Sequence, residues 1–375
     1  MKAESAQVAS ISDVHLGHHN TTAEEIIPNL HEAFKDTERN NALDVIIIAG
    51  DLFDRLMSLN NPQVFATMIW FGAFLRWAAA RKVAVRLLAG TKSHDWDQNQ
   101  FLMVLQEVMN VEGDVKYIDT LSIEYIDCID RHVLWVPDDW RPDPDVTWME
   151  VTQLLREKGL DKVDISVVHG SFEHQLPEVA NAHPHKLRRY LDISRDYVIG
   201  GHIHIPGSLE HFICNGSFDR LTHGEEGPKG HWRLKLNRKS GNEAEFIENK
   251  NAKKYITVDC AGLPLEDAMN LIKSEVSRIP TTSFVRVRAN EGDAILSLID
   301  TLRKNYPTYT WSTKKDERKD TQRILLTDMR STFQAVQLSP ENIVELLMTR
   351  LSEKHTQDPA MLQLCRDHLI QELER

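Results

Sequence analysis

Six side chains with the chemistry of metal ligands follow apolar, strand-like runs of the sequence. They are Asp13 and His15 in SDVHLG, Asp51 in GDLFDR, His169 in VVHG, and His202 and His204 in GGHIHIP. In a two-metal hydrolytic site, a carboxylate bridges two cations about 3.5–4 Å apart while further ligands complete each coordination sphere. Carboxylate combined with imidazole favours manganese, iron or zinc over magnesium or calcium. The mixture therefore predicts a two-metal site for phosphoester hydrolysis.

Each string taken alone also has an ordinary structural interpretation. An Asp-x-His at a strand end is commonly a turn with a capping side chain, and Asp51 would serve as well as a helix cap. A single histidine such as His169 is commonly a core or surface residue. The conjunction of the strings favours the metal site, because open α/β sheets place their ligands at the carboxyl ends of the strands.

The elements that must position these residues alternate between strand and helix over the first two-thirds of the chain. Apolar, β-branched runs predict strands at 7–12, 44–49, 83–89, 122–126, 132–136, 164–168 and 196–199. Helical periodicity predicts helices at 23–40, 64–81, 100–109 and 148–158. The repetition of strand, loop and helix predicts an α/β protein.

The pattern changes after residue 250. Residues 252–289 and 292–327 each show a strand, a helix and a strand, which predicts a small second α/β domain. Ser339-Pro340-Glu341 has the residues of a helix start, and a second helix is expected after Asp358-Pro359. We therefore divide the chain into 1–250, 251–330 and 331–375.

Composition and charge limit the class of protein and its partners. Of 375 residues, 41% are hydrophobic and 27% charged, which is typical of a soluble globular protein, and the amino terminus does not resemble a signal peptide. The most apolar window, 65–80, is too short for a membrane span and contains Arg76. Four cysteines without a CxxC pair predict reduced thiols in a cytoplasm. The net charge of −12 argues against DNA binding by counterion release alone, so DNA would need local basic patches or bound cations.

With GTKSHD (Gly90–Asp95) as the third member, five strings in this order resemble the calcineurin-like metallophosphoesterase superfamily. SDVHLG, GDLFD and the later NGSFDRLTHGEEGPKG (Asn215–Gly230) resemble its SbcD-type DNA repair nucleases of bacteria and phages. The resemblance covers about residues 8–204 by motif. It implies a four-layer α-β-β-α metallophosphoesterase sandwich with a smaller α/β capping domain and a C-terminal helical pair, in the cytoplasm of a bacterial or phage-infected cell.

The resemblance also implies residue roles. It implies two ligand sets that share Asp51, namely Asp13, His15, Asp51 and His204 for one metal and Asp51, His169 and His202 for the other. His94 would be the catalytic histidine, with Asp95 orienting its ring. Asp54 fits the bacterial and phage branch and is the third candidate catalytic residue. We expect two Mn²⁺ per subunit, with Mg²⁺ or another divalent ion as a substitute.

The third string departs from the family pattern. Relatives have Gly-Asn-His-Asp or Gly-Asn-His-Glu, in which the asparagine oxygen binds the second metal. Here Ser93 precedes His94, and two extra residues separate it from Gly90. Three interpretations remain open: Ser93 or a backbone carbonyl replaces the ligand, the second metal binds weakly until substrate phosphate completes it, or the site is inactive.

The resemblance implies a DNA exonuclease (3′→5′) and endonuclease subunit for double-strand-break processing, recombination and replication. Its partners would be DNA, an SMC-like (SbcC-type) ATPase bound by the C-terminal helices, and a second copy in a homodimer, with no membrane. Candidate DNA contacts are the basic residues Lys186, Arg188, Arg189, Lys314 and Lys315. The alternative to DNA contact is a solvated basic surface, and the alternative to ATPase binding is that the C-terminal helices pack on their own chain.

Two rival functions are hydrolysis of small phosphoesters and a non-catalytic scaffold.

Overall fold

The computed structural model describes residues 5–58, 60–176 and 183–315, together with residues 348, 362, 363, 366 and 367. Residues up to Lys315 form one compact unit. The strand expected within 323–327 falls outside the described residues, as do the two predicted C-terminal helices apart from the five isolated positions. The predicted boundaries at 250 and 330 remain predictions.

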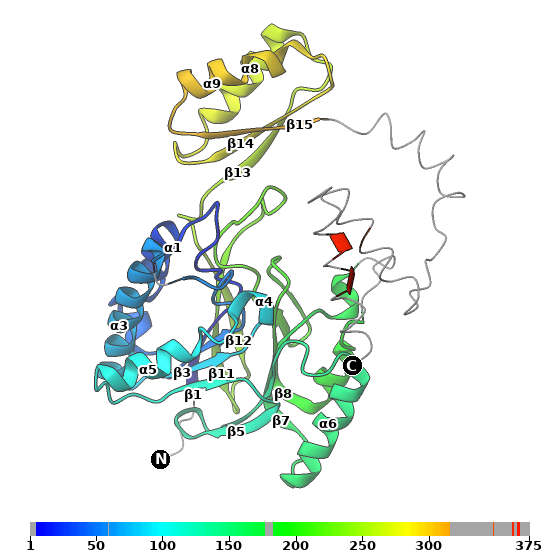
Figure 1. Ribbon diagram of the computed structural model, residues 1–375. Helices are drawn as coiled ribbons and strands as arrows, with labels where there is room; N and C mark the ends of the chain where they lie inside the picture. The colour runs from blue at the N-terminus through cyan, green and yellow to red at the C-terminus, as the bar shows by residue number, and fades with distance from the viewer. Residues whose placement is uncertain are drawn as a thin grey trace. The chain divides into compact units, whose positions relative to one another are not determined.

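The first of two six-stranded sheets has the order β12-β11-β1-β2-β3-β4, and Figure 1 labels four of its strands, β12, β11, β1 and β3. Its strands are β1 (Ser5–Ile11), β2 (Val45–Ala49), β3 (Ala84–Leu88), β4 (Val115–Ile118), β11 (Gly230–Asn237) and β12 (Glu243–Glu248). β1 to β4 are parallel, whereas β11 runs antiparallel to both β1 and β12. The parallel strands therefore bring their carboxyl ends to one edge of the sheet.

The second sheet has the order β5-β6-β7-β8-β10-β9. Its strands are β5 (Ser122–Ile126), β6 (Arg131–Val136), β7 (Val163–His169), β8 (Ser194–Gly201), β9 (Gly207–Leu209) and β10 (Phe212–Cys214). β6, β7, β8 and β10 are parallel, with antiparallel β5 and β9 at the two edges. These strands also end in loops that carry candidate ligands.

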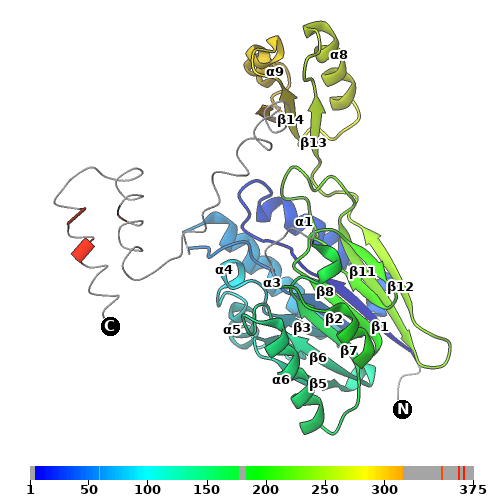
Figure 2. The ribbon, with the colours of Figure 1, turned by 90° about the vertical axis from the view of Figure 1, so that its right-hand side faces the viewer.

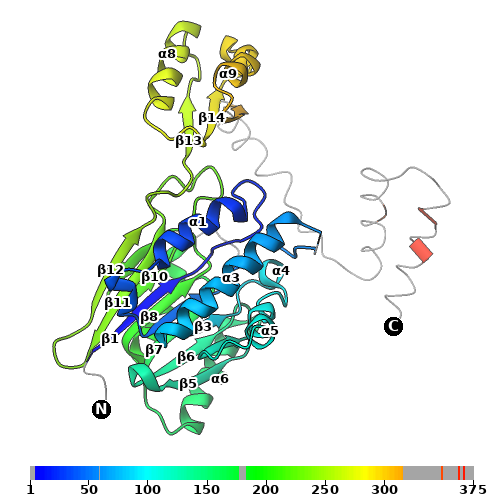
Figure 3. The same cartoon turned by 90° about the vertical axis from the view of Figure 1, so that its left-hand side faces the viewer.

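Three apolar cores separate four layers. α1 (Ala23–Phe34), α3 (Pro62–Arg81) and α5 (Gln100–Val108) pack on the outer face of the first sheet, and Figure 3 shows α1 and α3 along it. α6 (Pro144–Glu157) and α7 (Leu187–Ile193) pack on the second sheet, which α6 covers in Figure 2. The core between the sheets includes Ile47, Trp135 and Leu234. The predicted four-layer α-β-β-α sandwich is confirmed.

The third sheet follows residue 250 and is small. Three parallel strands, β13 (Tyr255–Asp259), β14 (Phe284–Ala289) and β15 (Thr310–Lys315), alternate with α8 (Leu265–Val276) and with the 3₁₀ turn η3 (Ala294–Leu298) that continues into α9 (Ile299–Asn305). Their core includes Ile272, Val285 and Trp311. Within the described residues, no helix combines the length and apolarity needed to cross a membrane.

The structure also corrects the predicted elements. The helix expected over 23–40 ends at Phe34, and a separate short helix, α2, spans Glu38–Asn41. The Asn40 amide donates to the carbonyls of Ala33 and Lys35, so a side chain closes the turn between the two helices. The sixth helix begins at Pro144, four residues earlier than expected, because Asp143 caps it through the N–H of Asp145.

Candidate metal centre

The predicted ligands converge from loops at the carboxyl ends of strands in both sheets. Asp13 follows β1, Asp51 follows β2, His169 is the last residue of β7, and His202 and His204 follow β8. The Asp13 N–H donates to the carbonyl of Gly50 at 3.1 Å, which holds the first two loops side by side. Three groups of ligand atoms lie within 4.8 Å of one another: Asp13, His15 and His204; His15, Asp51 and His94; and Asp51, His169 and His202.

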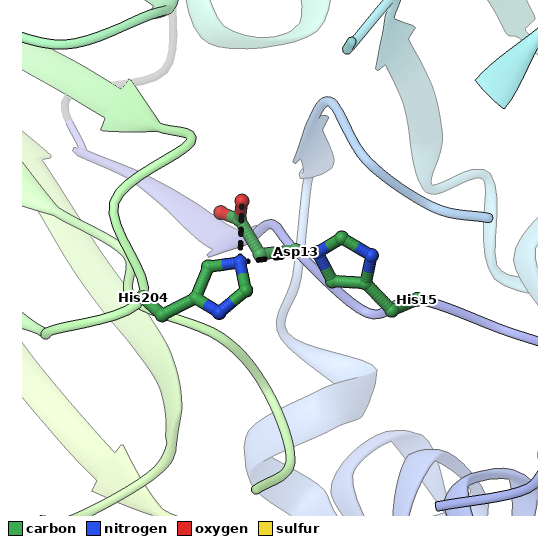
Figure 4. Close-up of side chains that lie close together, drawn as sticks. All are labelled: Asp13, His15 and His204. Atoms are coloured by element: carbon green, nitrogen blue, oxygen red, sulfur yellow. Dashed lines mark hydrogen bonds and ion pairs between the residues drawn. The ribbon is translucent and has the colours of Figure 1, made fainter. Parts of the chain in front are cut away.

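The first group joins Asp13 and two imidazoles (Figure 4). The Nε2 atoms of His15 and His204 lie 3.1 Å apart, and Nε2 of His204 lies 3.7 Å from Oδ1 of Asp13. Nδ1 of His204 lies 2.9 Å from Oε1 of Glu225, so this nitrogen carries the proton that it donates. Nε2 of His204 therefore presents its lone pair to Asp13 and His15.

What we call the second group comprises Asp51, His169 and His202. Asp51 is its central residue and is 1% exposed. Its Oδ1 lies 3.3 Å from Nε2 of His169, and its Oδ2 lies 3.9 Å from Nε2 of His15. Burial alone would raise the pKa of Asp51, but His169 and the neighbouring imidazoles outweigh it and hold that pKa well below its usual range. Asp51 thus stays ionised between the two groups, as a bridging ligand must.

Several buried atoms of this cluster have no hydrogen-bond partner. They are Oδ1 of Asp13, Nδ1 of His15 and Nε2 of His169. Nδ1 of His169 lies 2.7 Å from the carbonyl of Ala49 and must donate to it, so Nε2, which faces Asp51, is the ring nitrogen left to hold a cation or a proton. A lone pair and a carboxylate oxygen that face each other repel unless a cation or a proton lies between them. The residues therefore fit a pair of metal ions.

The ligand loops have uncommon backbone conformations. Four candidate ligands have positive φ, at 49° for Asp13, 54° for His15, 49° for Asp51 and 77° for His202. Such conformations cluster at functional sites, where surrounding structure holds them. Gly50 has φ of 90°, and a Cβ there would lie 2.1 Å from Nδ1 of His169. Only glycine lets the imidazole approach this closely.

The three predicted catalytic residues lie in different positions. His94 lies at the rim with 37% of its side chain exposed, and its Nδ1 is 2.9 Å from Oδ2 of Asp51. Asp54 has Oδ1 3.5 Å from Nδ1 of His15, on the opposite side of that ring from Nε2, which suits a positioning role. Asp95 was expected to orient His94. Instead its buried carboxylate accepts from the backbone N–H groups of Phe53 and Gly90, at 3.0 and 2.8 Å, and so fixes the loop.

In the altered loop after β3, the hydroxyl that lies beside the metal centre belongs to Thr91, whereas the sequence predicted Ser93. Ser93 is exposed, and its carbonyl accepts from the indole of Trp96. The hydroxyl beside the second group is that of Thr91, which lies 3.2 Å from Oδ2 of Asp51 and 3.5 Å from Nδ1 of His202. Thr91 directly follows Gly90, so the two extra residues come after it.

A buried ion pair behind His204 was also missed from the sequence. Glu225 lies 2.9 Å from both His204 and Lys229, and Lys229 donates to the carbonyl of His204 and to Ser217. These contacts fix both the ring and the backbone of His204, which is the usual task of groups behind a metal ligand. The pair lies within NGSFDRLTHGEEGPKG, where its spacing of four residues was the available signal.

Replacing Glu225 with alanine is expected to destabilise the protein by about 3 kcal/mol, since it leaves the charge of Lys229 buried without a counterion. Chemical denaturation with a chelator present would measure this apart from metal loss. The matched control is Glu243→Ala, which removes the exposed pair with Lys235 and should cost less than about 1 kcal/mol. Equal losses in the two variants would contradict the assigned role.

Among the described residues, no contact joins a predicted DNA-binding side chain to a candidate metal ligand. Arg189 pairs with Asp145 at 2.5 Å, Arg188 pairs with Asp192 at 2.8 Å, and Lys186 lies 3.9 Å from Asp145. Lys314 is exposed on β15, and Lys315 ends that strand. Neighbouring carboxylates thus largely balance the positive charges of Lys186, Arg188 and Arg189. DNA contact by all five basic residues stays a prediction.

A family of known proteins matches this chain. The family model for calcineurin-like phosphoesterases matches residues 6–206, more than half of the chain. One similar solved structure is GAP50, the anchor in the inner membrane complex of Plasmodium, with 16% identity and a TM-score of 0.42 over 66% of this chain and 86% of that one. Another is TT1561 of Thermus thermophilus, with 12% identity and a TM-score of 0.36 over 64% and 98%. No curated protein matched the chain.

Proposed function

The chain belongs to the calcineurin-like phosphoesterase family of metal-dependent hydrolases, and from that premise we propose that it is a two-metal DNA nuclease of the SbcD type. The observation that carries the proposal is the position of Asp51, whose two carboxylate oxygens face two separate groups of ligands. The motif string at 215–230 supports the nuclease branch through its resemblance to that branch, and its Glu225 and Lys229 hold the candidate ligand His204.

The proposed ligands divide into two sets that share Asp51. Asp13, His15 and His204 would complete the first site, and His169, His202 and the hydroxyl of Thr91 the second. Two divalent cations, for which we propose Mn²⁺, would neutralise the charge of a phosphodiester and supply a nucleophile at neutral pH. Imidazole and carboxylate ligands support that choice of metal.

His94 would act on the phosphate from the open side of the centre. Its side chain is more exposed than the buried ligands Asp13 and Asp51, and its ring centroid is 4.9 Å from that of His15. A histidine at this place can donate a hydrogen bond to a phosphoryl oxygen or protonate the departing sugar oxygen. Asp95 supports this from behind by fixing the backbone of the loop at Gly90.

Thr91→Val is expected to weaken binding of the second manganese ion by about 10- to 100-fold, because valine keeps the shape and the N–H contact to Asp51 but lacks the hydroxyl. Calorimetric titration of metal-free protein with Mn²⁺ would measure both sites. Ser93→Ala, in the same loop, is the control and should bind as the natural protein does. The opposite ranking of these two variants would return the ligand role to Ser93.

The substrate class is tested by comparing labelled duplex DNA with a chromogenic aryl phosphodiester, in manganese, with and without the candidate ATPase. Faster turnover of DNA supports the nuclease. Turnover of the small ester with DNA left intact would favour the rival small-molecule hydrolase. The third sheet and the predicted C-terminal helices support a macromolecular substrate, because a small ester needs neither.

We also propose a homodimer, formed by exposed apolar residues of α3 and α5. These residues are Phe65, Ile69, Phe101, Val104 and Val108, and Ile69 and Val108 are 74% and 77% exposed. The two helices pack against each other, and exposed apolar patches of this kind mark interaction surfaces. Ile69→Glu should convert a dimer to monomer in sedimentation equilibrium, whereas Met149→Glu on α6 should not. A natural protein that sediments only as a monomer would refute this.

The second proposed partner is an SMC-like ATPase, bound by the helices expected after residue 339. The sequence supports these helices by its helix-start residues and by apolar residues at helical spacing. This segment lies outside the described residues apart from isolated positions. An amphipathic helix laid in a partner's groove is a known mode of recognition.

A further inference from the structure

A cavity with charged and amide side chains in its walls lies away from the metal centre, between α1, α2 and the strands β11 and β12. Its volume is about 390 Å³, and its walls include Ala33, Asn40, His231, Arg233 and Ile247. None of the candidate metal ligands is among its lining residues in the described part of the chain. The volume lies within the range of small-ligand sites, about 300–1,000 Å³.

Arg233 is the buried charge of this cavity, with 7% of its surface exposed. Its Nε donates to Nε2 of His231 at 3.0 Å, and its Nη2 donates to Oδ1 of Asn40 at 2.5 Å and to the carbonyl of Ala33 at 3.3 Å. The guanidinium also lies over the ring of Phe34. Nη1 is buried without a hydrogen-bond partner, and no carboxylate among the described residues forms an ion pair with Arg233.

The imidazole of His231 adds a second unused donor. Because its Nε2 accepts from Arg233, its proton lies on Nδ1, which is also buried without a partner. Burial, followed by the charges of Arg233 and Arg39, lowers the pKa of His231 to about 3, so the ring is neutral at physiological pH. Both unused groups are therefore hydrogen-bond donors, and both require an acceptor.

The other charges that line the cavity largely cancel. Arg39 pairs with Glu245 at 2.6 Å, and Glu32 pairs with Lys35 at 2.5 Å, both between exposed side chains. Glu248 and Lys250 are exposed and opposite in sign. The positive charge of Arg233 therefore remains uncompensated, and an uncompensated buried charge is costly.

We propose that this cavity binds a small ligand through a phosphate group, which the guanidinium of Arg233 and the imidazole of His231, both in the cavity wall, would hold. The guanidinium supplies the missing charge complement, and its planar fork matches phosphate geometry. The volume leaves room for more than a bare phosphate ion. Asn29, Asn249 and Asn251 line the remainder and offer side-chain amides to a polar group such as a nucleoside.

The test is calorimetric titration of the full chain in a chelator, so that the metal centre cannot bind phosphate. Inorganic phosphate and deoxyadenosine 5′-monophosphate are the two probes, and one site per chain is expected for at least one of them. Arg233→Met should weaken binding about tenfold or more. Ile247→Trp, which narrows the cavity without removing a charge, should do the same. Arg278→Met, at an exposed arginine paired with Glu275, should leave the affinity unchanged.

The outcomes separate clearly. Equal affinity for the two probes identifies the phosphate group alone as the ligand, and tighter binding of the nucleotide identifies a nucleotide site. If neither probe binds, water meets the two donors and the proposal is wrong. Binding that survives both Arg233→Met and Ile247→Trp lies elsewhere and also overturns it. Should Arg233→Met fail to fold, Ile247→Trp decides the question alone.

Discussion

Asp51→Asn is expected to reduce bound manganese from two ions per chain to one or none, and to lower kcat on DNA by about 10³-fold or more. Asp51 lies between the two groups, with Oδ1 beside His169 and Oδ2 beside His15. An amide has a single oxygen and no negative charge, so it cannot bridge two cations. Metal analysis by mass spectrometry, together with kcat on labelled duplex DNA, measures both effects.

Asp219→Asn is the matched control for this change. Asp219 is equally buried, but its carboxylate accepts from the amides of Asn29 and Asn249 rather than facing the imidazoles. Metal content and kcat should stay near those of the natural protein. An Asp51→Asn protein that keeps two manganese ions and full activity would refute the bridging role.

His94→Ala is expected to lower kcat by about 10²- to 10⁴-fold while both manganese ions stay bound. The reason is position: His94 is at the exposed rim, and Asp51, whose Oδ2 its Nδ1 contacts, also accepts from the N–H and the hydroxyl of Thr91. Metal content and kcat must be measured on the same preparation. His31→Ala, at an exposed histidine on α1, controls for loss of an imidazole in general.

The two rivals to catalysis by His94 predict different results. If the chain is a non-catalytic scaffold, His94→Ala and the natural protein show the same background rate. If His94 is instead a metal ligand with His15 and Asp51, a grouping that the geometry permits, the variant loses manganese together with activity. Retained metal with lost activity is the combination that only the catalytic role explains.

The convergence of the candidate ligands was predictable from the sequence because it depends on strand ends. Each of Asp13, Asp51 and His169 stands where an apolar run stops, and parallel strands bring such ends to one edge. The same rule would have found Asp138, which follows β6 and has Oδ1 4.0 Å from Nδ1 of His202. That residue was missed because WVPDDW resembles an ordinary turn.

The strand β11 was missed because its residues alternate between two environments. Trp232, Leu234 and Leu236 face the core between the sheets, whereas His231 and Arg233 line the cavity on the opposite face. A search for continuous apolar runs overlooks such a segment, although alternation is itself a strand signal. The ends of α1 and α2 were not predictable from periodicity, since the Asn40 amide that separates them acts through a side-chain contact.

The candidate ligand in the altered loop could not be chosen from sequence spacing. Counting back from His94 leads to Ser93, whereas counting forward from Gly90 leads to Thr91. The backbone decides between them: α4 (Lys92–Asp95) places the two inserted residues in a helical turn, and the N–H of Thr91 donates to Oδ1 of Asp51 at 2.6 Å. A one-dimensional motif contains no such information.

Anomalous diffraction from crystals grown with manganese measures the metal pair most directly. Two peaks about 3.5–4 Å apart are predicted, one beside Asp13, His15 and His204 and the other beside His169 and His202, with Asp51 touching both. Crystals that diffract well but show no peak within bonding distance of Asp51, or only one, would contradict the two-metal centre and the nuclease that depends on it.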